Sequence, residues 1–145
     1  MKTPSILISD DRSKLQFDVI CRFLNDHSYW AKTRSRAMIE ESFDGSRWVF
    51  GMYDEENGVQ VGGARVVSDG CTFGYVTDVF IVPEFQGKGL GSRLLAAVME
   101  NPEVARVGRM ALLTETPEFY APFGFSVHGA GDPMEFMQRK LPDFL

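Results

Sequence analysis

The sequence predicts a single α/β domain whose central sheet is mixed but mostly antiparallel and is flanked by helices. Its length of 145 residues corresponds to one domain, 1–145, with one main core. Two segments with helical spacing of apolar residues come first, and three strand-like segments joined by short turns follow. A third helical segment and further short apolar segments complete the chain, so we expect helices on the faces of one sheet.

The N-terminal part is expected to form one strand and two helices. A short apolar run predicts a strand over 5–9. Ser13 and Gln16 have the spacing of a capping box, and apolar residues then recur on one face, so a helix is predicted from there to about Asn25. A second, shorter helix is predicted over 35–43.

The middle of the chain predicts three consecutive antiparallel strands. Segments 48–53 and 59–67 are rich in β-branched and aromatic residues and are separated by a turn of Asp, Glu, Asn and Gly. A Ser-Asp-Gly turn follows, and then a third strand over 71–82 that is long enough to lie near the centre of the sheet. Pro83 cannot donate to a strand ladder and therefore ends it.

Helical spacing returns in the C-terminal part and is then replaced by shorter elements. The predicted elements are a helix over 90–99, a strand over 110–113, a short helix from Pro117 to Gly124, and two strands, one from Phe125 and one over 135–140.

Charge and hydropathy exclude several classes of partner. Fifteen basic and twenty acidic residues give a net charge of −5, the wrong sign for a protein that binds by neutralising phosphates, so we expect no nucleic-acid partner. No apolar run approaches the roughly 18 residues that would span a bilayer. The first residues reach Asp10 and Asp11 where a signal peptide would have its apolar run, and we expect a cytoplasmic protein without membrane contact.

The cysteines do not predict a metal site. Cys21 and Cys71 are fifty residues apart, and the chain has only His27 and His128 to add to them. We therefore expect no metal and two buried free thiols, because free cysteine often behaves as a small core hydrophobe.

A glycine-rich loop between a strand and a helix is the most informative segment. Its sequence from Gln86 to Ser92 is Gln-Gly-Lys-Gly-Leu-Gly-Ser. Such a junction presents unpaired backbone N–H groups at the positive end of a helix dipole, and it therefore predicts a phosphate site. The spacing fits neither GxxxxGK[ST] of ATP and GTP sites nor GxGxxG of dinucleotide sites.

Two motifs in this order resemble the GCN5-related N-acetyltransferase (GNAT) superfamily. Gln86–Gly91 matches its pyrophosphate-binding motif Gln/Arg-x-x-Gly-x-Gly/Ala. About thirty residues later, Phe119–Phe125 looks like its Leu-Tyr-x-x-x-Gly-Phe signature. The order of strands and helices is also similar over nearly the whole chain.

The resemblance implies that acetyl-CoA lies between the strand that ends at Val82 and the strand that ends at Leu113. The pantetheine arm would pair with backbone groups of one strand, and the pyrophosphate would lie on the amides of the glycine loop. Lys88 either adds charge there or is an ordinary solvated lysine. The implied cofactor-binding residues are Phe80, Ile81, Val82, Gln86, Gly87, Lys88, Gly89, Leu90, Gly91 and Ser92.

The implied reaction is direct transfer of an acetyl group from acetyl-CoA to the amine of a small molecule or peptide. The departing sulfur needs a proton, and Tyr120 is the candidate general acid because the family usually has a tyrosine here. Asp78, inside an apolar strand, is the candidate base; it could instead bind a cationic substrate, relay a proton through water, or pair with an arginine such as Arg65. Thr77 stands where some polyamine-type members have a glutamate.

Substrate choice in similar proteins depends on the connection between the first two helices. Tyr29 and Trp30 lie there and either frame a cation or ring or fill the core. Thr114 or Thr116 would have to replace an asparagine that contacts the cofactor in many relatives. A non-catalytic acyl-CoA sensor with the same fold is the alternative function. Dimers are common among similar proteins, so a homodimer stays open.

Overall fold

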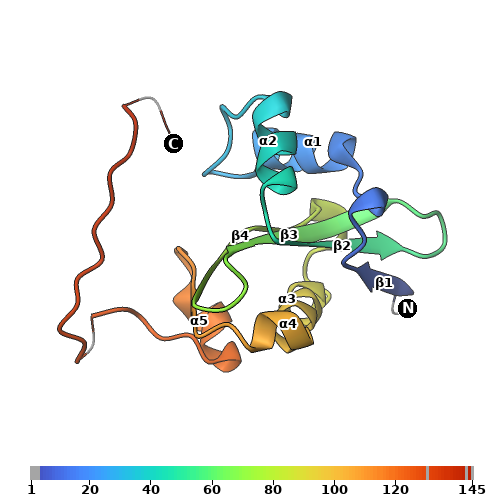
Figure 1. Ribbon diagram of the computed structural model, residues 1–145. Helices are drawn as coiled ribbons and strands as arrows, with labels where there is room; N and C mark the ends of the chain where they lie inside the picture. The colour runs from blue at the N-terminus through green and yellow to red at the C-terminus, as the bar shows by residue number, and fades with distance from the viewer. Residues whose placement is uncertain (1–3, 130, 143, 145) are drawn as a thin grey trace.

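The computed structural model describes residues 4–129, 131–142 and 144, and in it one five-stranded sheet forms the centre of the protein (Figure 1). The strands lie in sequence order, antiparallel except for the parallel pair β4 and β5. The predicted fold class is confirmed. The strands are β1 (Ile6–Ser9), β2 (Trp48–Asp54), β3 (Gln60–Ser68), β4 (Phe73–Ile81) and β5 (Arg109–Ala111).

Helices cover both faces of the sheet, as Figure 1 shows. On one face lie α1 (Phe17–His27) and α2 (Arg36–Asp44), and on the other lie α3 (Leu90–Glu100) and the short α4 (Pro102–Ala105). The sheet therefore separates two apolar clusters, one under each helical layer. The helix α5 (Pro117–Tyr120) and a 3-10 turn (Ala121–Phe123) follow β5. No helix among the described residues is long and apolar enough to cross a bilayer.

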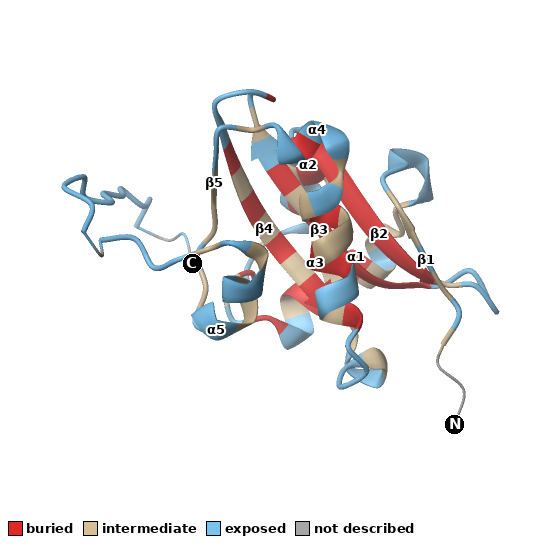
Figure 2. Ribbon diagram, turned by 90° about the horizontal axis from the view of Figure 1, so that it is seen from below, coloured by how far each residue is buried: buried red, intermediate tan, exposed pale blue. Residues whose placement is uncertain are grey.

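Burial along the strands follows from this layering. The strand β2 is buried at all but its last residue because helices lie over both of its sides (Figure 2). In β4, buried and half-buried residues alternate, as expected for a strand of which one face is better covered. The three-strand segment and its two turns are thus where the sequence predicted them.

The start of α1 differs from the predicted capping box. Ser13 lies in a separate 3-10 turn (Arg12–Lys14), where its backbone N–H donates to Asp11 Oδ1. The helix begins only at Phe17. The Gln16 side chain does not cap it but bonds with the backbone of β3: its Oε1 accepts from Gln60 N at 3.0 Å. A long-range contact therefore takes the place of the predicted local one.

The two C-terminal strands predicted from Phe125 and over 135–140 are wrong for the described residues, which have no strand after β5. The predicted helix from Pro117 to Gly124 is one α-helical turn followed by the 3-10 turn. The described residues from 125 onward contain no helix or strand and are largely exposed (Figure 2).

Tyr53 in β2 provides a test of the packing. Its ring is 5% exposed, and its hydroxyl is buried above Gly51 with no hydrogen-bond partner in the described structure. This burial raises the pKa of Tyr53 to about 12. Because an unfolded tyrosine titrates near 10, the unfolded state loses its proton first, and stability should fall as the pH rises from about 10 to about 12.

We expect Tyr53→Phe to raise the free energy of unfolding by about 1 kcal/mol, since it removes an unpaired buried hydroxyl. This gain in stability should be larger at about pH 11. At that pH the Tyr53 of the unfolded wild type is ionised and must take up a proton to fold, whereas phenylalanine has no such cost. Urea unfolding at neutral and alkaline pH measures both effects. A loss of stability at neutral pH would mean that the hydroxyl has a partner in solution.

Candidate active site

The sheet opens between β4 and β5. The two parallel strands pair only where Phe73–Tyr75 meets Arg109–Ala111. β4 then continues to Ile81, bonded to β3 on one side and to no strand of the described chain on the other. The backbone groups of the second half of β4 therefore face an opening at which a ligand can add hydrogen bonds.

A bulge in β4 lies beside this opening. The register with β3 moves from Gly63 opposite Phe80 to Arg65 opposite Thr77, so β4 has one residue more than β3 here. Asp78, within this bulge, has a φ of +53°, which is rare for a residue other than glycine. Asp and Asn tolerate this region better than other residues, which is one reason for an aspartate here.

The Asp78 carboxylate is the centre of a buried group that we call the Asp78 cluster, formed with Trp30, Arg34 and Arg65. Its Oδ1 accepts from Trp30 Nε1 at 2.7 Å and from Arg34 Nη1 at 3.1 Å. Its Oδ2 accepts from Arg65 Nε at 2.7 Å. The Asp78 side chain is 0% exposed. The alternative that Asp78 pairs with Arg65 is therefore confirmed.

The occupied oxygens bear on the other roles considered for Asp78. Both already have donors, and neither is exposed to a substrate amine. The cluster ties the bulge to the connection between α1 and α2, which carries Trp30 and Arg34. This arrangement supports a positioning role more than direct proton transfer.

The glycine loop has the geometry that a phosphate site requires. Gly87 and Gly89 have φ of +77° and +74°, and nothing lies within 4 Å of the place where a Cβ would stand. Gly89 is the N-cap of α3, and no side chain caps the first N–H groups of that helix. These amides are free to donate to an anion at the positive end of the helix dipole. The residues thus fit a pyrophosphate.

Backbone groups at the end of β4 form hydrogen bonds on both sides of the strand. Val82 N donates to Val61 O in the direction of β3, at 2.8 Å. Ile81 O accepts from the side-chain amide of Gln86, also at 2.8 Å. The Phe80 ring lies in the α1 and α2 core, stacked on Phe23 at 4.8 Å. The Phe80 side chain is therefore not placed to meet a cofactor.

Gly91 allows close packing between two helices, whereas Gly87 and Gly89 provide the positive φ of the loop. A Cβ on Gly91 would come within 3.3 Å of the Phe119 ring, so this glycine lets α5 pack closely on the start of α3. The packing places α5 at the same end of the sheet as the glycine loop. Tyr120 follows Phe119 directly and is half-buried.

Tyr120 lies close enough to Tyr29, one of the two residues predicted for substrate binding, for the two phenols to interact electrostatically. Tyr29 and Trp30 meet edge to face with centroids 5.0 Å apart. Burial raises the pKa of Tyr120, and the nearby Tyr29 phenol raises it further. The Tyr120 ring also contacts Phe119 and Phe125. The structure thus brings the four predicted side chains Tyr29, Trp30, Asp78 and Tyr120 to one region.

Other predicted residues have simpler surroundings. Lys88 is exposed. Thr114 and Thr116 bond to each other, at 3.1 Å between hydroxyl oxygens. The expectation of buried thiols is wrong, because Cys21 is half-buried and Cys71 exposed. No group of three or more potential metal-ligating His, Cys, Asp or Glu side chains occurs among the described residues.

Sequence reasoning missed Arg34. It lies in a loop and belongs to no motif, although its guanidinium completes the Asp78 cluster. The only available signal was indirect: a carboxylate within an apolar strand needs cationic partners, and one arginine on the neighbouring strand need not be enough.

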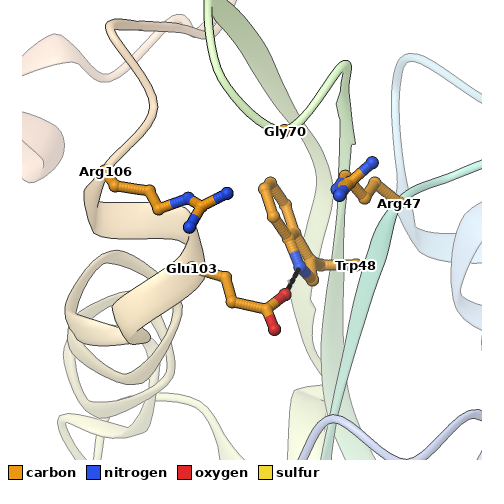
Figure 3. Close-up of a pocket in the computed structure, with 5 residues that line it drawn as sticks. All are labelled: Arg47, Trp48, Gly70, Glu103 and Arg106. Atoms are coloured by element: carbon orange, nitrogen blue, oxygen red, sulfur yellow. Dashed lines mark hydrogen bonds between the residues drawn. The ribbon is translucent and has the colours of Figure 1, made fainter.

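A small pocket at the opposite end of β4 is separate from this region. It has a volume of about 110 Å³ and is lined by Arg47, Trp48, Gly70, Glu103 and Arg106 (Figure 3). Trp48 Nε1 donates to Glu103 Oε2 across it at 2.8 Å. Ligand sites of drug size are usually about 300 Å³ or more, so this pocket is too small for a cofactor with a long arm.

This fold is similar to that of solved structures of acetyltransferases. A crystal structure of a protein assigned to the GNAT family, from Xanthomonas campestris, is 35% identical and has a TM-score of 0.87. The likeness covers 97% of this chain and 96% of that one. The family model for the acetyltransferase (GNAT) domain matches residues 46–127. The chain belongs to the GNAT family of acetyltransferases.

Two further comparisons concern the family and the fold separately. A protein of Gibberella zeae that is assigned as an acetyltransferase is 36% identical over an alignment of 130 positions; the alignment covers 75% of this chain and 72% of that one. Glucosamine-6-phosphate N-acetyltransferase from Arabidopsis thaliana is only 16% identical. Its structure covers 96% of this chain and 99% of its own, with a TM-score of 0.64, and shows the shared fold.

Proposed function

We propose that the protein transfers an acetyl group from acetyl-CoA directly to the amine of a small molecule or peptide. The observation that carries this proposal is the opening between β4 and β5, which ends at the uncapped start of α3. A cofactor with an extended amide-containing arm and a pyrophosphate fits that combination of free strand edge and free helix amides. A cytoplasmic location remains a prediction.

The chemistry requires a proton at the sulfur. The amine nitrogen, once neutral, attacks the thioester carbonyl; the carbon–nitrogen bond forms and the carbon–sulfur bond breaks. We assign the Tyr120 hydroxyl to donate its proton to the departing sulfur. The proton lost by the amine goes to water, and the Tyr120 phenolate regains a proton from water. A tyrosine hydroxyl is protonated at neutral pH, and burial raises the pKa of Tyr120 further.

The acceptor amine is proposed to enter beside Tyr29 and Trp30. Tyr29 is 57% exposed, so its ring is available to a ligand. Trp30 is half-buried and held by its bond to Asp78, so it forms a fixed wall. In this arrangement Asp78 is a positioning residue, and it acts on the reaction through the place of Trp30 and the shape of the bulge.

Cofactor binding is tested first, by thermal unfolding with acetyl-CoA, CoA, ATP and NAD added separately. A ligand at 100 times its Kd adds about 2.7 kcal/mol to the stability of the folded state, which should raise the Tm by several degrees. We expect this shift with acetyl-CoA and CoA alone. No shift with either would overturn the proposal.

A glycine substitution tests whether acetyl-CoA binds at the glycine loop. Gly89→Ala puts a methyl group on a positive-φ residue in the loop, and Gly58→Ala does the same in the turn between β2 and β3. Both should cost about 1 kcal/mol of stability. Only Gly89→Ala should weaken the acetyl-CoA shift, because only its methyl group stands where the pyrophosphate is expected. Equal acetyl-CoA shifts in the two variants would exclude the loop.

A non-catalytic acyl-CoA sensor is the second candidate, favoured by one observation: both oxygens of Asp78, the predicted base, are occupied. The measurement that separates the candidates is CoA release with a panel of amines. Binding without release for every amine would favour the sensor.

A further inference from the structure

The Asp78 cluster has one positive charge in excess. It contains one carboxylate, that of Asp78, and two guanidinium groups, those of Arg34 and Arg65. No other carboxylate of the described residues forms a salt bridge with either guanidinium. The side chains of the two arginines are only 13% and 11% exposed. A largely buried charge without a counter-charge is unfavourable, so the cluster favours the binding of an anion.

Arg34 has two donors left for such an anion. Its Nη1 donates to both oxygens of Asp78, at 3.1 and 3.2 Å, whereas its Nε and Nη2 have no hydrogen-bond partner among the described residues. In this part of the chain only the Tyr53 hydroxyl is a fully buried side-chain polar atom without a partner, so both nitrogens of Arg34 retain access to solvent. Nε and Nη2 lie on one edge of the planar guanidinium, and such an edge can bind both oxygens of a carboxylate.

Arg65 is less available, because two of its three nitrogens donate inside the protein. Its Nε donates to Asp78 Oδ2 at 2.7 Å, and its Nη1 donates to Ser46 Oγ at 3.2 Å. The guanidinium carbon also lies 5.8 Å from the centre of the Phe43 ring, in the apolar cluster under α1 and α2. We therefore expect the anion to bind at Arg34.

The backbone of Arg34 is held in place by the rest of its loop. Its N–H donates to Ala31 O at 3.2 Å, and its carbonyl accepts from Asn25 Nδ2 at 2.9 Å. The Phe144 ring lies 5.7 Å from the guanidinium carbon, a cation–π contact that supplies no net negative charge. A guanidinium that is already fixed loses little conformational entropy when a ligand binds, which favours affinity.

The free edge of Arg34 belongs to the region where the acceptor amine is proposed to enter. Arg34 and Trp30 donate to the same oxygen, Asp78 Oδ1. The Trp30 ring contacts the Tyr29 ring, and the Tyr29 phenol is close enough to Tyr120 to raise its pKa. These contacts form a continuous path from the anion position at Arg34 to the proposed general acid.

We propose that the acceptor is an amine that also carries a carboxylate, as amino acids do, and that Nε and Nη2 of Arg34 bind this carboxylate. The inference rests on the proposed function and names its substrate class. The bound carboxylate neutralises the excess charge of the Asp78 cluster, and the amine end extends along Trp30 and Tyr29 toward Tyr120. An amine of the same shape without the negative charge leaves Arg34 without a counter-charge and binds less tightly.

The first test compares amino acids with the corresponding amino-acid amides in the CoA-release assay, over a panel with different spacings between amine and carboxylate. Acid and amide differ in the group that Arg34 would bind. The amide has the less basic amine, so amine basicity alone would favour the amide. We expect kcat/KM to be about tenfold or more higher for the acid of the best pair. CoA release with no preference for any acid would overturn the inference and leave acetyl transfer to amines intact.

Arg34→Lys tests the residue itself. Lysine retains a positive charge near Asp78 but lacks the two parallel donors of the guanidinium edge. It should raise the KM for the acids about tenfold, with kcat little changed and the KM for the amides unaffected. Arg36→Lys, in the exposed pair with Asp18, is the matched control and should change neither KM. A merely structural role of Arg34 would affect acids and amides alike, and an acid preference that survives Arg34→Lys would overturn the assignment.

Equilibrium binding separates a failure of this inference from a failure of the proposed function. The same acids and amides are titrated into the protein saturated with CoA, and the dissociation constants are measured by calorimetry, which needs no turnover. Absence of CoA release with every amine would overturn the proposed function. The carboxylate site is then supported by tighter binding of acids than of amides in the wild type that is lost in Arg34→Lys, and any other binding result overturns it.

Discussion

Replacing Tyr120 with phenylalanine should lower kcat for acetyl transfer by about 10²- to 10⁴-fold, the range that a general acid contributes. The hydroxyl is the only group lost, and no hydrogen bond within the described residues uses it, so the fold should be unaffected. The aromatic contacts with Phe119 and Phe125 remain. Acetyl-CoA binding, measured as the thermal shift, should be close to that of the wild type.

The pH dependence is a second readout of the same role. The acid must be protonated to act, and the raised pKa of Tyr120 extends its protonated range to higher pH. The fall in rate from loss of this proton should therefore come above the ordinary tyrosine value of about 10. Tyr53→Phe removes the same group from a remote strand and is the matched control. Equal kcat for Tyr120→Phe and Tyr53→Phe would exclude Tyr120 as the acid.

Replacing Asp78 with alanine should lower the free energy of unfolding by about 3–5 kcal/mol, because it leaves Arg34 and Arg65 buried without their counter-charge. Alanine also tolerates the positive φ of this residue less well than aspartate. Asp78→Asn keeps the shape and the backbone preference but removes the charge, and it should therefore lose less stability. Denaturant unfolding at neutral pH measures both.

The exposed ion pair of Asp18 with Arg36 is the control for this prediction. Asp18→Ala also removes a carboxylate bound to an arginine, but both side chains are exposed and solvated. We expect little change in the denaturant midpoint. An Asp78→Ala variant no less stable than Asp18→Ala would mean that the buried cluster does not hold the bulge in place.

The elements that the sequence predicted best depend on local chemistry. Turn residues and alternation predicted β2, β3 and β4, and the glycine loop was predicted because strand, glycines and helix are adjacent in the chain. Elements that depend on distant contacts were predicted poorly. Gln16 was expected to cap a helix but bonds to β3, because a buried partner outcompetes a local one.

The residues of the candidate site show the same difference between local and distant contacts. Arg65 could be named as a partner of Asp78 because antiparallel neighbours lie opposite each other, whereas Arg34 reaches it from a loop 44 residues away in the sequence. The strands predicted after Phe125 have strand-like composition, but a strand also needs an edge to pair with. Which edge is used cannot be determined from local composition.

Because the ladder between β4 and β5 is short, we expect the part from β5 to α5 to open separately from the rest of the protein. Beyond Tyr75 no ladder joins β4 to β5, so the part from β5 to α5 is held mainly by packing, such as that of Phe119 on Gly91. A part with few backbone bonds to its neighbours opens at a lower free energy than the rest of a protein. A molecule that donates and accepts along the free half of β4 while touching α5 would join this part to the rest of the protein, so occupancy of the site would itself stiffen the fold.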